Sequence, residues 1–187
     1  GNASLGTAFL INKQGLSLTN WHVLNGARQI VVYLSDSEGN VTESKHFGIK
    51  RIVDQNREYD YAIFYVDFDE NTRDNLSPLP LTRLSSAAGD KVAAVGNPAP
   101  GTEILPMRFA GGKISSYNED DRRNGQIGID VAITNGFSGG PLCNYYGEVV
   151  GISKSGYSGS NANLNFAVDI MKVRVRLDEL NCVYDGK

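Results

Sequence analysis

The stretch NGFSGGPL, residues Asn135 to Leu142, places one serine among three glycines and a proline. Glycine lets the backbone adopt a positive φ and lets another group approach closely, so the stretch predicts a tight turn that presents the hydroxyl of Ser138. A serine hydroxyl becomes a strong nucleophile only when a general base lies beside it. Taken by itself, the stretch is more typical of an ordinary loop, because glycine and serine are common in turns. The role of Ser138 therefore depends on the rest of the chain.

The general base beside a nucleophilic serine is most often a histidine, and the chain has only His22 and His46. The pattern G-x-S-x-G, which begins at Gly136, also occurs in α/β-hydrolases, but that fold needs a histidine after the serine and none follows Ser138. The subtilisin order places an aspartate before the histidine. No aspartate precedes His22, so that order is left only with His46 and would require an α/β fold. The remaining order along the chain is histidine, aspartate, serine.

His22 and Asp60 fit that remaining order. His22 lies in SLTNWHVLNGA, between a β-like run and the turn pair Asn-Gly, which is the end of a strand. Asp60 opens the apolar run Tyr61 to Val66, where an ionised carboxylate needs a partner. Each residue also has a structural alternative: His22 as a packed core histidine, Asp60 as the end of a turn. His46, in the charged stretch ESKHFGIK, is expected to be solvated. His22, Asp60 and Ser138 together are the candidates for a Ser-His-Asp triad.

Composition narrows the class of protein. With 187 residues, 41% hydrophobic and 21% charged, the chain is an ordinary globular protein of one domain or two small ones. A net charge of −3 gives no indication of nucleic-acid binding, and no apolar run approaches the ~20 residues of a membrane span. No motif indicates a metal, a nucleotide or an organic cofactor. The two cysteines, Cys143 and Cys182, are expected to be free thiols, with a single disulfide as the alternative.

Short apolar or alternating runs separated by turn residues predict an all-β sandwich or barrel. The polar segment 71–89, with Pro78 and Pro80, divides the chain into halves and is interpreted as a linker between barrels. The end of the chain fits either a strand over 172–177 or a helix with Asp169 as its N-cap, and the helix is favoured.

With these residues in order, the chain resembles the chymotrypsin-like serine proteases and is most similar to their HtrA (DegP-like) branch. The resemblance rests on LGTAFLIN, TNWHV, DYAIFYVD, VGNPAPG, FAGGKISS, IDVAITNGFSGGPLCNYYGEVVGI and NLNFAVD, which together cover nearly the whole chain. It implies an all-β fold of two six-stranded antiparallel β-barrels with a short C-terminal helix. Residues 1–84 would form the barrel that carries the histidine and aspartate, and residues 85–187 the barrel that carries the serine and the helix.

The resemblance also implies a serine endopeptidase that acts on polypeptides through an acyl-enzyme. Ser138 would be the nucleophile, His22 the base and Asp60 its orienting carboxylate, and the backbone N–H groups of Gly136 and Ser138 would form the oxyanion hole. A substrate pocket that prefers a small or apolar residue before the scissile bond would be walled by Ala132, Ile133, Thr134, Lys154, Ser155, Gly156 and Asn165. Lys154 would either favour an acidic residue nearby or be merely solvated.

Several alternatives stay open. Phe137 stands where trypsin-like enzymes activated by N-terminal cleavage have an aspartate, so that activation is not expected. No PDZ domain follows, so either flanking domains were trimmed off or the protease stands alone, and the oligomeric state is undecided. The segment NEDDRRNG, 118–125, is expected to be a solvated turn rather than a gating loop.

Family analogy places the protein in the periplasm or outside the cell, with the cytoplasm as the alternative. A catalytically silent binding module and an esterase with the same triad are the competing functions.

Overall fold

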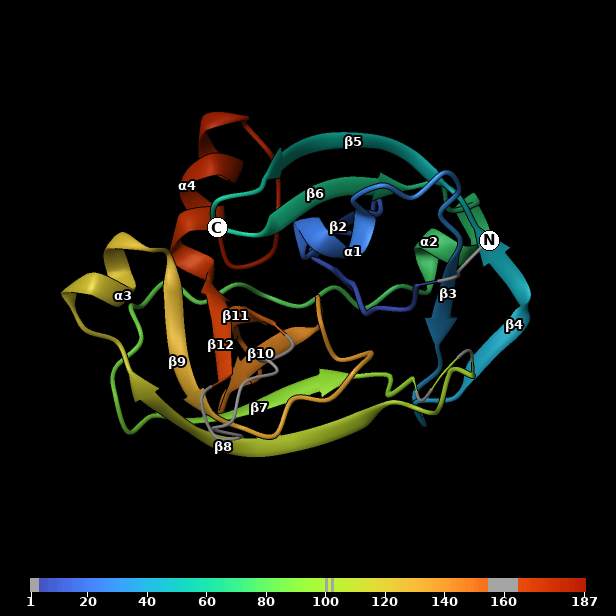
Figure 1. Ribbon diagram of the computed structural model, residues 1–187. Coiled ribbons are helices and arrows are strands. Elements are labelled where there is room, and N and C mark those ends of the chain that lie inside the picture. The colour runs from blue at the N-terminus through green and yellow to red at the C-terminus, as the bar shows by residue number, and fades with distance from the viewer. Residues whose placement is uncertain (1–3, 100, 102, 155–164) are drawn as a thin grey trace.

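The computed structural model describes residues 4–99, 101, 103–154 and 165–187, and within them the protein is mostly β (Figure 1). The first-half strands are β1 (Phe9–Leu10), β2 (Leu16–Thr19), β3 (Val32–Ser35), β4 (Val41–Phe47), β5 (Ile49–Asn56) and β6 (Tyr61–Val66). The second-half strands are β7 (Lys91–Gly96), β8 (Arg108–Ser116), β9 (Gln126–Asp130), β10 (Pro141–Asn144), β11 (Val149–Ser153) and β12 (Asn165–Asp169). The helices are α1 (Trp21–Leu24), α2 (Glu70–Asp74), α3 (Glu119–Arg123) and α4 (Ile170–Glu179). The prediction of a mainly β fold with a short C-terminal helix is confirmed.

The second half forms a closed antiparallel barrel in the order β10-β11-β12-β9-β8-β7. Strand β9 illustrates how the interior of the barrel is filled. Its alternating apolar residues predicted a strand, and Ile127 and Ile129 are both fully buried inside the barrel. Val131, directly after the strand, continues the same buried face. The barrel interior is therefore filled by side chains and is the core that supports the loop around Ser138.

The first half does not close in the same way. Its strands form a four-stranded sheet in the order β1-β2-β6-β5 and a separate β3-β4 hairpin. The middle residues of β4 are exposed, so this strand has little apolar surface to bury against a further neighbour. The prediction of a closed six-stranded barrel is thus confirmed for the second half, whereas in the described part of the first half the strands are divided between two sheets.

A shared core joins the two halves. It contains Leu18 and Ile63 from the first-half sheet, Ile152 from the barrel, and Val173 and Leu177 from α4, all fully buried. The helix prediction for the chain end is confirmed, since Asp169 caps α4 by accepting a hydrogen bond from the backbone N–H of Met171 at 3.0 Å. In Figure 1, α4 lies at the end of the barrel next to β5 and β6. Residues 170–179 form a helix rather than a strand because their buried apolar residues recur at helical spacing and share one face.

Two segments differ from expectation. Residues 118–125 were expected to form a solvated turn, but they contain α3, which begins with a capping box between Asn118 and Asp121. The segment 71–89 was expected to be a linker, yet it begins with part of α2, and Leu81 is fully buried and bridges to Val149 of β11. Residues 118–125 are thus helical but still mostly exposed, as expected of a solvated segment, whereas the segment around Leu81 is a packed part of the fold. Cys143 and Cys182 are free thiols, as expected.

Candidate active site

His22 and Asp60 form a close pair. The Nδ1 atom of His22 lies 2.8 Å from Oδ2 of Asp60, and the backbone N–H of His22 donates to Oδ1 of the same carboxylate at 3.0 Å. Strand pairing brings them together: β2 ends at Thr19, shortly before His22, and β6 begins directly after Asp60, with Thr19 opposite Ala62. A histidine held through both its backbone and its ring has one orientation and one tautomer.

The backbone of Asp60 is held in an unusual conformation. Its φ of 61° is left-handed, a region that costs a non-glycine residue about 1–2 kcal/mol. The side chain of Asn20, which is fully buried, donates from Nδ2 to the carbonyl oxygen of Asp60 at 3.0 Å. The left-handed turn therefore persists because Asn20 and His22 hold it from two sides. Asn20 was not among the predicted site residues, although it stands in the TNWHV stretch.

Ser138 lies in a loop that the first half of the chain holds in place. The backbone N–H of Thr7 donates to the carbonyl oxygen of Ser138 at 2.9 Å, and the hydroxyl of Thr7 donates to the carbonyl oxygen of Gly136 at 2.6 Å. The hydroxyl of Thr19 donates to the carbonyl oxygen of Thr7 at 2.7 Å. Thr7 therefore links the end of β2, near His22, to the loop that carries Ser138. No sequence pattern pointed to this role of Thr7.

The same loop is fixed to the barrel on its other side. The backbone N–H of Gly139 donates to the carbonyl oxygen of Ser153 at 2.9 Å, and the N–H of Ser153 donates to the carbonyl oxygen of Gly140 at 2.9 Å. An added Cβ at Gly139 or Gly140 would lie within 2.2 Å of another atom. These two glycines are therefore needed for close approach of neighbouring backbone, as the sequence suggested.

The turn around Gly136 fixes the orientation of the peptide group between Asn135 and Gly136. Phe137 N–H donates to the carbonyl oxygen of Thr134 at 3.1 Å, and Gly136 has a φ of 94°, whereas Asn135 is not among the described non-glycine residues with positive φ. This combination is a type II turn. The carbonyl oxygen of Asn135 accepts from the N–H of Ala99 at 3.1 Å. Because a trans peptide points its N–H and C=O in opposite directions, the N–H of Gly136 is directed away from Ala99.

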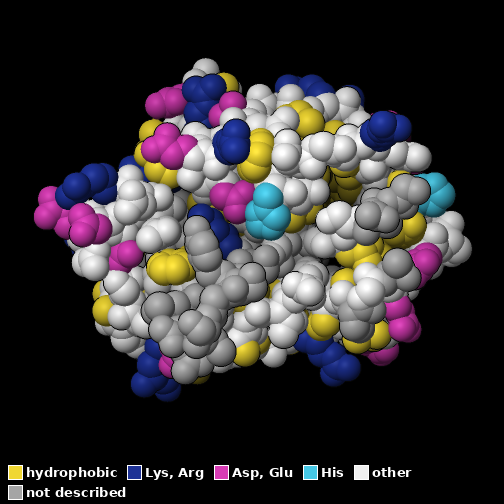
Figure 2. Space-filling view, in the orientation of Figure 1, with side chains coloured by type: hydrophobic (Ala, Val, Ile, Leu, Met, Phe, Trp, Pro, Cys, Tyr) yellow, Lys and Arg dark blue, Asp and Glu magenta, His cyan; other side chains and the backbone are white. Residues whose placement is uncertain are grey.

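A cavity of about 250 Å³ brings these groups together. Figure 2 shows one histidine in the middle of the face, beside an acidic side chain and a basic side chain. The cavity is lined by Ser4, Leu5, His22, Val23, Asn135, Gly136 and Ser138. The structure thus places the predicted base, nucleophile and oxyanion-hole glycine around one space. His46 lies on the exposed part of β4, with its ring edge-on to Tyr33.

The predicted substrate-pocket residues lie elsewhere around the Ser138 loop. Of those that the structure describes, none lines the cavity that contains His22 and Ser138. Ala132 and Thr134 are exposed, Ile133 is half-buried, and the side chain of Asn165 donates to the carbonyl oxygen of Val131 at 2.6 Å. Ser155 and Gly156 lie outside the described residues.

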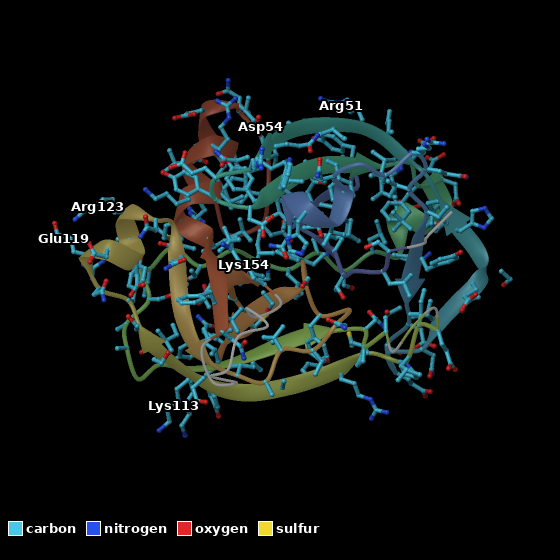
Figure 3. The ribbon with its side chains drawn as sticks, viewed as in Figure 1. Arg51, Asp54, Lys113, Glu119, Arg123 and Lys154 are labelled. Atoms are coloured by element: carbon cyan, nitrogen blue, oxygen red, sulfur yellow. The ribbon has the colours of Figure 1, made fainter. Side chains whose placement is uncertain are left out.

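Lys154 is not simply solvated. It follows β11 directly and is half-buried, and burial lowers the pKa of its ammonium while the negative charge of Asp60 acts in the opposite direction. Figure 3 shows it between the first-half strands and the barrel.

Within the described part of the chain, no cluster of three or more histidine, cysteine, aspartate or glutamate side chains is arranged to hold a metal ion. Among the described helices, none has the length and apolar character to cross a membrane.

Comparison with known proteins places this geometry in context. The family model described as "Trypsin-like peptidase domain" matches residues 6–152. The chain is 35% identical over 173 residues to a probable periplasmic serine endoprotease, DegP-like, of Halomonas elongata, covering 89% of the chain and 33% of the relative. It is 34% identical over 178 residues to the serine endoprotease DegS of Haemophilus influenzae, covering 89% of the chain and 47% of the relative. The chain thus spans between a third and a half of these curated relatives.

Solved structures show the same likeness. The serine endoprotease from Yersinia pestis superimposes with a TM-score of 0.74 at 28% identity, over 95% of this chain and 57% of that one. The HtrA-type protease AlgW, solved with a decapeptide, superimposes with a TM-score of 0.73 at 27% identity, over 95% of this chain and 51% of that one.

Proposed function

The chain belongs to the trypsin-like peptidase family, in its HtrA-like (DegP-like) branch, and from this premise we propose that it is a serine endopeptidase with Ser138, His22 and Asp60 as its catalytic triad. The observation that carries the proposal is the carboxylate of Asp60 bound to both the ring and the backbone of His22, with His22 and Ser138 lining one cavity. In this proposal the three residues, from separate segments of the chain, take the roles of nucleophile, base and orienting carboxylate that acyl transfer requires.

The contact between Asp60 and the ring of His22 determines which nitrogen of His22 acts as the base in the proposed mechanism. Asp60 accepts from Nδ1 of His22 and so leaves Nε2 as the basic nitrogen. Nε2 takes the hydroxyl proton as Oγ of Ser138 bonds to the scissile carbonyl carbon, and the imidazolium that forms is stabilised by Asp60. Nε2 then gives this proton to the leaving amine as the carbon–nitrogen bond breaks. Water, deprotonated by His22, hydrolyses the resulting acyl-enzyme and regenerates the hydroxyl of Ser138.

In this proposal the backbone N–H groups of Gly136 and Ser138 stabilise the oxyanion. The type II turn supports this assignment, because the carbonyl of Asn135 is occupied by Ala99 and the opposite N–H is free to face the cavity that Gly136 lines. An oxyanion hole with its donors already oriented needs no peptide flip before reaction.

The finer architecture belongs to the same proposal. Residues 1–84 would act as the half that supplies His22 and Asp60, and residues 85–187 as the half that supplies Ser138. The substrate is a polypeptide, and the periplasm, the location in the names of the DegP-like relatives, is the proposed location.

We propose that the residue before the scissile bond, P1, enters the predicted pocket, whose described members are Ala132, Ile133, Thr134, Lys154 and Asn165. None of these carries a negative charge, and the amide of Asn165 is already bound to the carbonyl oxygen of Val131. A pocket without a carboxylate favours small or apolar P1 residues over lysine and arginine.

Labelling with a fluorophosphonate probe tests the triad, because the probe bonds covalently only to an activated serine. Wild type should be labelled, whereas Ser138→Ala and His22→Ala should not. Ser115→Ala, which changes an exposed serine on β8, is the matched control and should label like wild type. Failure of folded wild type to react would favour a silent binding module. Labelling combined with turnover of esters but not of peptides would favour an esterase.

A further inference from the structure

Lys154 lies beside the loop that carries Ser138. It comes directly after Ser153, whose backbone holds Gly139 and Gly140, and its own N–H donates to the carbonyl oxygen of Phe166 in β12 at 3.1 Å. Its backbone is therefore fixed beside the loop of Ser138. Figure 3 shows Lys154 between the two halves of the protein.

The ammonium group of Lys154 loses hydration without gaining an ion-pair partner. Within the described residues, no carboxylate lies within 4.0 Å of it, although Lys45 and Lys187 both have such partners. The undescribed residues contain no aspartate or glutamate, so they bring no side-chain carboxylate either. Asp60 acts on Lys154 only at longer range, and both of its oxygens already accept hydrogen bonds from His22. A partly buried, unpaired cation is unfavourable unless a negative group comes from outside.

We propose that Lys154 is a specificity-determining residue that binds the carboxylate of an aspartate or glutamate side chain in the polypeptide substrate, close to the scissile bond. This inference rests on the proposed endopeptidase function. The preference has to be local, because a net charge of −3 gives the whole molecule no general attraction for acidic peptides. A substrate carboxylate beside Lys154 would restore the lost hydration energy with a charge-assisted hydrogen bond.

The test uses fluorogenic peptides with an apolar P1 residue and a single glutamate moved through the positions on either side of the scissile bond. Each peptide is compared with its glutamine counterpart by kcat/KM. Wild type should prefer glutamate at one position by about tenfold or more, the range expected for a charge-assisted contact. Lys154→Met should abolish this preference, Lys154→Arg should retain it, and Lys154→Glu should reverse it. Lys113→Met, which changes an exposed lysine on the far side of the barrel (Figure 3), should leave it unchanged.

Two results would overturn the assignment. One is wild type that cleaves the glutamine peptides but prefers glutamate at no position. The other is Lys154→Met that retains the preference or lowers kcat/KM equally for both peptide series, since an equal loss would mean that Lys154 acts through Asp60. Fluorophosphonate labelling of each variant shows which proposal fails. A labelled enzyme without glutamate preference contradicts only the Lys154 assignment, whereas an unlabelled wild type contradicts the endopeptidase function and the Lys154 assignment with it.

Discussion

A methyl group added at Gly136 has no room in this structure. An ideal Cβ there would lie 2.3 Å from the carbonyl oxygen of Asn97 and 2.7 Å from the backbone nitrogen of Ala99, and backbone atoms cannot rotate away as a flexible side chain can. The φ of 94° is also unfavourable for alanine. Gly136→Ala should therefore turn the Asn135–Gly136 peptide away from its present orientation.

In the proposed mechanism, the Asn135–Gly136 peptide contributes the N–H of Gly136 to the oxyanion hole. Rotation would move the N–H of Gly136 away from the proposed oxyanion hole and break the hydrogen bond from the N–H of Ala99 to the carbonyl oxygen of Asn135. Loss of one oxyanion donor typically lowers kcat by about 10²–10³, or about 3 kcal/mol of transition-state stabilisation. The conformational strain is a separate cost of about 1–2 kcal/mol to folding. In a chain of this size that strain lowers Tm by about 2–8 °C.

Gly147→Ala is the matched control. Gly147 has a φ of 77° in the turn between β10 and β11, and nothing lies within 4 Å of its would-be Cβ. It therefore reports the cost of the backbone conformation without a clash near Ser138. Peptide turnover and fluorophosphonate labelling rates should fall about 10²–10³-fold for Gly136→Ala and remain near wild type for Gly147→Ala. If folded Gly136→Ala kept wild-type kcat, the reasoning that places its N–H at the oxyanion would be refuted.

Three further changes address the groups that hold the site. Asn20→Ala removes the donor to the carbonyl of Asp60, so kcat should fall about tenfold with little change in KM, measured by steady-state kinetics. Thr7→Val removes the hydroxyl bound to Gly136 and should lower the free energy of unfolding by about 1–3 kcal/mol in urea titrations. Burial and a hydrogen bond to a carboxylate raise the pKa of Tyr117 to about 12. Because an unfolded tyrosine ionises near pH 10, this stabilisation is complete below about pH 10 and is lost as the pH rises toward 12, and Tyr117→Phe should remove that loss from the stability profile.

A specific result would contradict each of these three predictions. Thr7→Ser keeps the hydroxyl and should retain most of the lost stability, so equal destabilisation by serine and valine would mean that the methyl group, not the hydrogen bond, matters. A rise in KM without a fall in kcat for Asn20→Ala would show that Asn20 affects substrate binding rather than the orientation of Asp60. An unchanged alkaline limb in Tyr117→Phe would assign that limb to other tyrosines, such as Tyr184, whose pKa is also about 12.

The sequence could single out His22, Asp60 and Ser138 as triad candidates because it offers few alternatives. Two histidines and the order of three residue types left one arrangement compatible with an all-β chain. The apolar run after Asp60 identified that aspartate among many, and it becomes a central strand paired with β2. The structure then puts Asp60 against His22, the contact that this interpretation needed.

The supporting contacts were not accessible in this way. Asn20 and Thr7 act through hydrogen bonds to residues 40 and 129 positions away, and no local pattern distinguishes them from any other polar residue in a β-rich chain. The β3-β4 hairpin is a further case, because whether a strand finds a second neighbour depends on how the sheets pack. For α3 the signal was local: Asn118 followed three residues later by Asp121 is an N-terminal capping pattern, which was interpreted only as a polar turn.

The contacts around Thr7 have a consequence for how the site responds to mutation. The first-half sheet carries His22 and Asp60, the barrel carries Ser138, and Thr7 connects them through hydrogen bonds to Thr19 and to the Ser138 loop. The halves are also joined by the shared core in which α4 packs and by contacts away from the site, such as the ion pair between Arg176 and Asp54 at 2.7 Å. We therefore expect a change that loosens this core to shift His22, the proposed base, relative to Ser138, the proposed nucleophile, before either half loses its own strands. Because catalysis is sensitive to displacements of about 1 Å, activity should be the first property to decline when this interface weakens.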